Sequence, residues 1–174
     1  MKGHDRPSEL ARSQQSYAVA LNLVHRHDGA LDFFGLPKPD HFERVAANLL
    51  RIFPAANPAQ IQAALLHDAL EPDNLSIEIL YDTGVLPDAI RMIQQVTLPQ
   101  PEGDYLAYIC RLIKSGDMEA MQVKLADNID AVNLLRKGLA PEASHLLEGR
   151  YLPSCTLLSN ALNIDIDLFS GKGI

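Results

Sequence analysis

The chain has 174 residues and a mass of 19.1 kDa, a length typical of one domain with its own hydrophobic core. Apolar residues make up 47% and charged residues 21% of the sequence, and the mean hydropathy is −0.03. This composition excludes an intrinsically disordered chain, which needs low hydrophobicity. The formal net charge of −7 and the isoelectric point near 5.2 argue against a protein that grips a nucleic-acid backbone.

The sequence shows no pattern of a membrane or secreted protein. No apolar run reaches the roughly 18 residues that a membrane span needs. The start, MKGHDRPSELARSQQ, lacks the apolar region of a signal peptide. Two cysteines, Cys110 and Cys155, are too few for a disulfide framework and form no paired-ligand motif. We therefore expect a soluble cytoplasmic protein with neither a membrane nor a nucleic acid as its partner.

Apolar residues recur at helical spacing along almost the whole chain, and no stretch alternates as a strand would. Candidate caps and breakers divide the pattern: Asp40 and Asn57 begin helices, and Gly84 and Gly138 end them. The predicted helices span 8–27, 41–53, 58 to near Pro72, 75–82, 87–97, 104–114, 118–137 and a region within 141–163 that is broken near Pro153. The sequence thus predicts an all-α fold, a single compact domain over 1–174 with a C-terminal helical extension at 141–165.

Histidine and aspartate occupy three of these otherwise apolar helices. His41 opens one helix, His67 and Asp68 lie at the end of AALLHDAL, and Asp127 lies within VKLADNIDAV. Imidazole nitrogen and carboxylate oxygen bind first-row metals, and a site built from three helices lies naturally inside a bundle. Burying either aspartate without a partner would cost roughly several kcal/mol. A divalent cation would give both aspartates and both histidines a partner at once. The adjacent pair can reach one ion only if the backbone turns there, which a helix end near a proline allows.

Each of these groups also has a purely structural explanation. A His-Asp dipeptide is often a surface or capping pair, and His41 could be an exposed residue of a first helical turn. Asp127 could form an ion pair with Lys124, which lies one helical turn away. The joint pattern favours a metal site, because each piece lies in a predicted helix and two of them are embedded in apolar sequence.

The arrangement of His41, the His67-Asp68 pair and Asp127 resembles that of the HD superfamily of metal-dependent phosphohydrolases. The strings HFERVA, AALLHDALEPDN, DYLAYICRLIKSGD and VKLADNIDAVNLL resemble the RelA/SpoT-type hydrolase domain, and more closely its small stand-alone bacterial relatives, over roughly 15–140. This resemblance implies an all-helical HD domain and a divalent metal, usually manganese in that branch. It also implies hydrolysis of a phosphate ester, with the alarmone (p)ppGpp as the best-known substrate.

The resemblance assigns roles to individual residues. The positions that match the family's metal ligands are His41, His67, Asp68 and Asp127. Glu71 matches the first acidic residue after the His-Asp pair, which in alarmone hydrolases helps to orient or deprotonate the attacking water. Lys124 matches the lysine of the KLAD string, where it could offset phosphate charge, although a lysine paired with aspartate is its structural alternative.

Three departures from the family pattern concern the substrate side. The second acid after the His-Asp pair is replaced by Pro72, with Asp73 one position later. Ala131 stands where the family usually has an asparagine. The upstream segment GALDFFGLPKP carries Lys38 as its one cation, where alarmone hydrolases have a basic run that helps to bind the nucleotide. The resemblance therefore implies an intact metal site with a degraded set of substrate-recognition residues.

The expected activity is hydrolysis of a small nucleotide or related phosphate ester. A divalent ion with four protein ligands would leave two positions for water and a substrate oxygen and would lower the pKa of that water. Glu71 would take the proton of the water, although a surface glutamate beside a proline is its structural alternative. An HD-type 5′-nucleotidase would use the same ligands with a different pocket. The other alternative is a non-catalytic module, in which the metal stabilises the bundle and the pocket binds a nucleotide or a partner protein.

A few further residues are secondary candidates. His25 and His27 lie two positions apart and do not share a helix face, so we do not expect them to bind one ion together. Tyr105 and Tyr108 lie near the expected cleft, where a tyrosine could stack on a base, but packing on a half-buried face is the favoured explanation. Asp130 is expected as a polar group near the mouth of the cleft.

Overall fold

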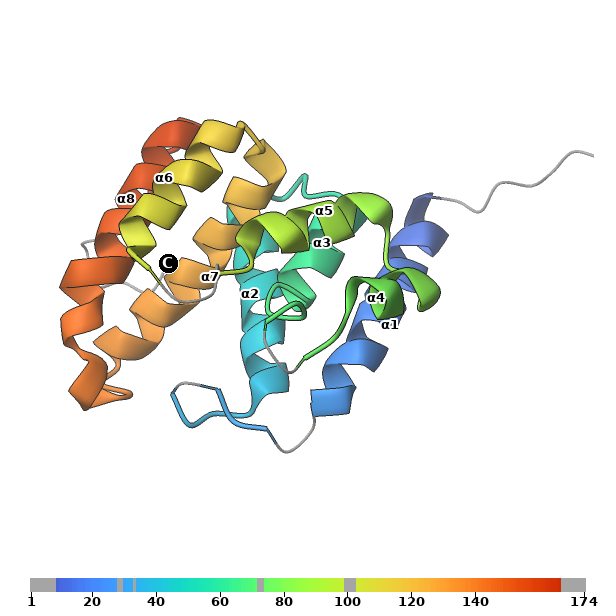
Figure 1. Cartoon of the computed structure of the whole chain (residues 1–174), viewed down its shortest axis with the longest axis horizontal. Coiled ribbons are helices and arrows are strands. Elements are labelled where there is room, and N and C mark those ends of the chain that lie inside the picture. Colours follow the sequence, from blue (N-terminus) through green and yellow to red (C-terminus); the bar gives the residue numbers. More distant parts are fainter. Residues whose placement is uncertain (1–8, 28–29, 33, 72–73, 99–102, 167–174) are drawn as a thin grey trace, which may run out of the picture.

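A computed structural model describes residues 9–27, 30–32, 34–71, 74–98 and 103–166 of the chain (Figure 1). These residues form a compact bundle of α-helices, which confirms the predicted all-α class. No β-strand occurs in these ranges, where Leu31 and Pro37 form an isolated bridge. Within the same ranges, no helix combines the length and the apolar character needed to cross a bilayer.

The helices follow one another with short connections, and most of them lie where the apolar period predicts. The α-helices are α1 (Glu9–Val24), α2 (Lys38–Ile52), α3 (Pro58–Leu65), α4 (Ile77–Asp82), α5 (Pro87–Val96), α6 (Tyr105–Ser115), α7 (Met118–Arg136) and α8 (Leu152–Leu162). Two 3-10 turns, η1 (His25–His27) and η2 (Pro141–Ala143), and a π-helical turn, η3 (Leu147–Tyr151), complete the described helical structure.

Side-chain caps determine where several helices begin. Asn57 accepts a bond from the backbone N–H of Gln60, and the Gln60 side chain accepts one from the backbone N–H of Asn57, a capping box at the start of α3. Asp104 accepts two backbone N–H groups at the start of α6. The prediction that Asp40 caps α2 was wrong. This helix begins at Lys38, so Asp40 lies in its first turn, where a negative charge still favours the helix N-terminus.

Helix α3 ends earlier than its apolar pattern predicts. The pattern continues toward Pro72, which lies outside the described residues, but the α-helix stops at Leu65 and the chain continues in tight turns. The pattern misleads because the turn itself is buried, so its residues remain apolar without being helical. The early end frees His67 and Asp68 from helical geometry, in which adjacent side chains do not share a face.

Helix α7 runs through the middle of the bundle (Figure 1). It packs against α2, α3 and α5 and also against α6 and α8. Buried residues occur all around this helix, including Leu125, Ile129 and Val132, which have no exposed surface. Because α7 is enclosed, each polar side chain that it carries inward needs a partner from a neighbouring element.

The C-terminal extension is part of the bundle, since α8 packs against both α6 and α7. The break expected near Pro153 lies earlier, in the η3 turn, and α8 begins at Leu152. Pro153 is accommodated in the first turn of α8, where its missing N–H has no intrahelical partner to lose.

Candidate metal centre and its pocket

A cavity of about 440 Å³ lies beside α7 and is lined by acidic, basic and aromatic side chains. Its walls come from the segment before α2, from α2, from the turn after α3, from the residues just after α5, from α6 and α7, and from the η3 region. The lining residues are Asp32, Phe34, Lys38, His41, Asp68, Glu71, Leu98, Tyr105, Lys124, Asp127, Ala131, Leu146, Arg150 and Tyr151. Most of the residues predicted from the sequence to form a site therefore share one cavity.

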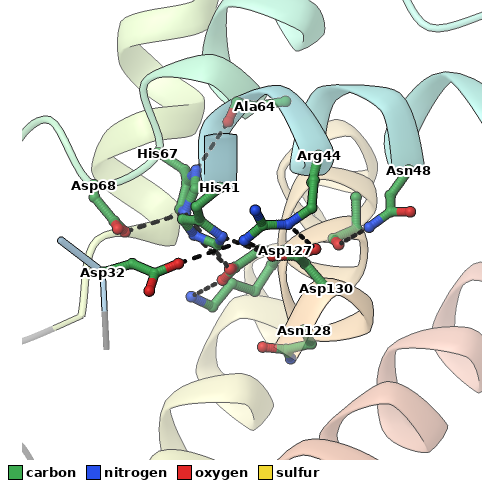
Figure 2. Close-up of polar contacts among 12 residues, drawn as sticks. Asp32, His41, Arg44, Asn48, Ala64, His67, Asp68, Asp127, Asn128 and Asp130 are labelled. Atoms are coloured by element: carbon green, nitrogen blue, oxygen red, sulfur yellow. Dashed lines mark hydrogen bonds and ion pairs between the residues drawn. The ribbon is translucent and has the colours of Figure 1, made fainter. Parts of the chain in front are cut away.

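Two histidines and two aspartates meet beside this cavity (Figure 2). His41, Asp68 and Asp127 line it, whereas His67 is buried. The Nε2 atoms of His41 and His67 lie 3.1 Å apart. Oδ1 of Asp68 lies 3.3 Å from Nε2 of His67. Oδ1 of Asp127 lies 3.6 Å from Nε2 of His41 and 3.5 Å from Nε2 of His67. The structure thus brings together all four residues that the sequence predicts as metal ligands.

Partners at the opposite ring nitrogens determine which nitrogen of each histidine carries the proton. Nδ1 of His41 lies 2.9 Å from Oδ2 of Asp130, and Nδ1 of His67 lies 2.8 Å from the carbonyl oxygen of Ala64. A carboxylate and a carbonyl accept hydrogen bonds and do not donate them. Each neutral ring therefore carries its proton on Nδ1 and leaves a lone pair on Nε2.

This donor set fits a divalent cation. Two nitrogen lone pairs face each other, and carboxylate oxygens lie beside them, so negative potential accumulates where the four side chains meet. Ligand atoms of His41, His67 and Asp68 all lie within 4.8 Å of one another, close enough to reach one ion. A cation would relieve the repulsion between the lone pairs and neutralise the carboxylates at the same time.

The protonation of His41 reflects the same demand for positive charge. Burial by itself lowers the pKa of His41, but the hydrogen bond with Asp130 and the charges of Asp127 and Asp68 outweigh burial, and the pKa is raised. A proton and a metal ion therefore compete for the same lone pair.

The carboxylate of Asp127 has two different partners. Its Oδ1 atom faces the histidines, and its Oδ2 atom accepts a hydrogen bond of 2.8 Å from Nζ of Lys124. Burial alone would raise the pKa of Asp127, but the ammonium of Lys124, with His67 and His41, holds that pKa below its usual range. For Lys124, burial is outweighed by Asp127 and the pKa is raised well above its usual value. The ion pair foreseen as the structural alternative for Lys124 is thus present, inside the cavity wall.

Glu71 lies in the same cavity, near the end of the turn that carries His67 and Asp68. Burial and the neighbouring charge of Asp68 raise the pKa of Glu71, against the opposing effects of Lys124 and His67. The turn is braced by Asn74, whose side-chain amide donates to the carbonyl oxygen of Asp68 at 2.8 Å. Pro72 and Asp73 lie outside the described residues.

Sequence reasoning missed a group that lies behind His41. Asp130 was expected at the mouth of the cleft, but the structure buries it with 2% of its surface exposed. Its Oδ1 atom accepts from Nε of Arg44 at 2.9 Å and its Oδ2 atom from Nη2 of Arg44 at 3.1 Å, while Oδ2 also contacts His41 (Figure 2). The spacing of three residues between Asp127 and Asp130 on one helix was the available signal.

Sequence reasoning also missed Arg150 and Tyr151, which line the cavity together with Tyr105. The guanidinium carbon of Arg150 lies 3.9 Å from the ring centroid of Tyr105 and 5.3 Å from that of Tyr151. The hydroxyl of Tyr105 donates to Oδ1 of Asn128 at 2.6 Å, so one ring both packs in the core and lines the cavity. Tyr108 is buried and donates to a backbone carbonyl, which agrees with the favoured packing explanation for that residue.

The expectation that His25 and His27 do not bind one ion together stays a prediction. His25 is exposed on the η1 turn. The side chain of His27 lies outside the described part.

Cys110 and Cys155 are both free thiols, the first exposed and the second buried.

Comparisons with known proteins place the fold. No protein-family model matches the sequence, and no curated protein matches it either. Among solved structures, the chain is similar to that of a metazoan ortholog of SpoT that hydrolyses ppGpp and plays a role in starvation responses. The sequence identity is 22%, the TM-score is 0.63, and the match covers 94% of this chain and 91% of that chain.

The likeness, which spans almost the whole chain, shows that this protein has the HD-type fold. Its helical arrangement is similar to that of the SpoT ortholog. At 22% identity the likeness concerns the fold alone, and the chemistry has to be argued from the side chains of this protein.

Proposed function

We propose that this protein is a metal-dependent phosphohydrolase that acts on a small nucleotide or a related phosphate ester. The main support is the convergence of Nε2 of His41 and Nε2 of His67 on two carboxylates at the wall of a cavity. The residues that would hold the ion are His41, His67, Asp68 and Asp127, and manganese is the expected metal. When bound, such an ion would acidify water and polarise a phosphoryl oxygen.

Glu71 is the proposed general base. Its carboxylate shares the cavity with the candidate ligands, and its raised pKa makes it a better proton acceptor than an ordinary glutamate. In this proposal Glu71 orients the attacking water and takes its proton at a carboxylate oxygen. Lys124 holds Asp127 in place and adds positive charge on the side where a phosphate would lie.

The rest of the cavity supports a phosphorylated organic substrate. Lys38 and Arg150 add positive charge to its lining, and Tyr105 and Tyr151 add aromatic surface. Such a combination suits an anionic group joined to a ring. Because the similar solved structure is of a protein that hydrolyses ppGpp, (p)ppGpp is the first substrate to test.

A panel of phosphate esters with Mn²⁺ tests this proposal. Protein stripped of metal is incubated with (p)ppGpp, nucleoside 5′-phosphates and sugar phosphates, and phosphate and pyrophosphate release are measured with and without the ion. We expect release that depends on Mn²⁺ and is lost in His67→Ala and Asp68→Ala. Asp88→Asn, an exposed change on α5, is the matched control. Release that survives His67→Ala would contradict the proposal.

The non-catalytic module is the second candidate, and one observation favours it. Ala131 lines the cavity at the position where the resembling family usually has an asparagine, so this wall lacks an amide that could contact a substrate. Binding of Mn²⁺ without product from any substrate in the panel would favour this module. Release from 5′-phosphates alone would favour a 5′-nucleotidase.

A further inference from the structure

Asp130 differs from the other acidic residues near the candidate metal centre because it faces the back of a ligand. Its carboxylate accepts a hydrogen bond from Nδ1 of His41 at 2.9 Å, on the side of the ring opposite the candidate ligand atom Nε2. Its side chain is 3% exposed, so solvent cannot readily take over this bond. Asp130 therefore sets both the orientation of the His41 ring and the nitrogen that carries its proton.

Two hydrogen bonds from Arg44 hold the carboxylate of Asp130 in place. The Nε and Nη2 atoms of Arg44 donate to the two carboxylate oxygens at 2.9 and 3.1 Å, a paired arrangement that fixes the position and orientation of the carboxylate (Figure 2). Arg44 lies three residues after His41 on α2, so both side chains project from one face of the helix toward α7.

The network continues to the rim of the cavity. Nη2 of Arg44 also contacts Oδ2 of Asp32 at 3.4 Å. The other oxygen of Asp32 accepts the backbone N–H groups of Phe34 and Leu36 at 2.8 and 2.9 Å, and this bonding fixes the segment before α2. Asp32 and Phe34 line the cavity, so the network joins its rim to the back of His41.

His67 provides an internal comparison. Its Nδ1 bond goes to the backbone carbonyl of Ala64, which no substitution removes. His41 has a side chain in the same role, held by a second side chain. Both rings thus have the same proton placement, but one of them depends on residues that can be replaced.

We propose that Asp130, fixed by Arg44, is a positioning residue that presents Nε2 of His41 to a divalent cation and thereby sets the affinity of the site. This inference rests on the proposed function insofar as the site must bind a cation. In Asp130→Asn, Arg44 takes the amide oxygen and the NH₂ group turns to Nδ1 of His41. The proton of the ring then moves to Nε2, and the ligand atom loses its lone pair.

Calorimetric titration of metal-free protein with Mn²⁺ alone tests the proposal. We expect Asp130→Asn and Arg44→Gln each to weaken Mn²⁺ binding by about 10- to 100-fold, the range typical of lost partners behind a metal ligand. Arg44→Lys keeps the charge but not the paired geometry and should fall between Arg44→Gln and the parent protein. Arg51→Gln, a change of an exposed arginine on the same helix, is the control and should bind as the parent does.

Nitrogen NMR of the imidazole rings shows which ring nitrogen carries the proton. This placement would not change if Asp130 only stabilised the fold. In the metal-free protein, at a pH where both rings are neutral, we expect His41 to carry its proton on Nδ1 in the parent and on Nε2 in Asp130→Asn. The proton of His67 should stay on Nδ1 in both proteins. If Asp130→Asn does not fold, the Arg44 variants decide by Mn²⁺ affinity, which should fall from the parent protein to Arg44→Lys and again to Arg44→Gln.

The outcomes separate this inference from the proposed function. If the parent binds Mn²⁺ and both substituted proteins bind it equally well, the positioning role is wrong while the metal site stands. If the parent binds no Mn²⁺, the metal site itself is wrong and the positioning role falls with it. In Asp130→Asn, a weaker affinity with unchanged proton placement on His41 would also overturn the proposed mechanism.

Discussion

Lys124 donates to Oδ2 of Asp127 over 2.8 Å, so one oxygen of this carboxylate is engaged while the other faces the two histidines. The pair lies on one helix, three residues apart, and both side chains are largely removed from solvent. Asp127 therefore belongs at once to an ion pair of the core and to the candidate metal centre. A substitution that removes the ion pair is therefore expected to affect the candidate metal centre as well.

Lys124→Met tests this double role through stability. The substitution leaves the carboxylate of Asp127 buried without its cation, and we expect the free energy of unfolding of the metal-free protein to fall by about 3–5 kcal/mol. Mn²⁺ should offset part of this loss, because it replaces the missing positive charge. Urea unfolding in a chelator and in Mn²⁺ measures both values.

Lys137→Met, at the exposed end of α7, is the control and should leave the unfolding free energy nearly unchanged. An equal loss for Lys124→Met with and without Mn²⁺ would contradict the double role of Asp127, because the ion would then not compensate for the missing ammonium.

Asp68→Asn should reduce the stabilisation that Mn²⁺ gives to the folded protein. An ion at 100 times its dissociation constant stabilises a folded protein by about 2.7 kcal/mol, and the variant should gain much less at the same concentration. Because Asp68 is partly exposed, its replacement should change the stability of the metal-free protein little. Thermal unfolding with and without Mn²⁺ gives the comparison, and a full metal-induced gain in Asp68→Asn would contradict its role as a ligand.

Glu71→Gln should separate binding from reaction. The amide cannot take a proton from water, so we expect product release to fall by about 10²- to 10⁴-fold, with Mn²⁺ affinity retained. Steady-state rates and calorimetry measure the two properties. Glu78→Gln, an exposed change on α4, is the control. A variant that retains the full rate would exclude Glu71 as the base.

The two cysteines should differ in reactivity. Burial raises the pKa of the Cys155 thiol to about 12, with a further contribution from Asp127, whereas Cys110 is exposed. The reactive thiolate of Cys155 is therefore scarce at neutral pH. A thiol reagent should modify Cys110 alone in the folded protein and both residues in urea. Rapid modification of Cys155 in the folded Cys110→Ser protein would disagree with its burial.

Local signals made the helix starts and the candidate ligands predictable. Asn57 and Asp104 cap their helices because their side chains accept hydrogen bonds from nearby backbone N–H groups. Such caps can be predicted from a few adjacent residues. The polar residues His67, Asp68 and Asp127 stand out in apolar sequence, so their need for partners is visible without a structure.

Long-range contacts and a buried turn could not be predicted in the same way. Arg44 and Asp130 lie 86 residues apart, and nothing near either one shows that they pair. The end of α3 at Leu65 is hidden because its buried turn keeps an apolar composition. Arg150 reaches the cavity through the π-helical η3 turn, which sequence periodicity does not indicate.

The enclosure of α7 has a consequence for how this protein can diversify. Lys124, Asp127 and Asp130 project from a helix that is packed on all sides, so most substitutions along it lower stability before they change selectivity. Asp32, Phe34 and Lys38, before and at the start of α2, and the η3 turn line the same cavity from the periphery. New substrate preferences should therefore arise at those two margins, and a mutant library confined to them should keep the largest share of folded members.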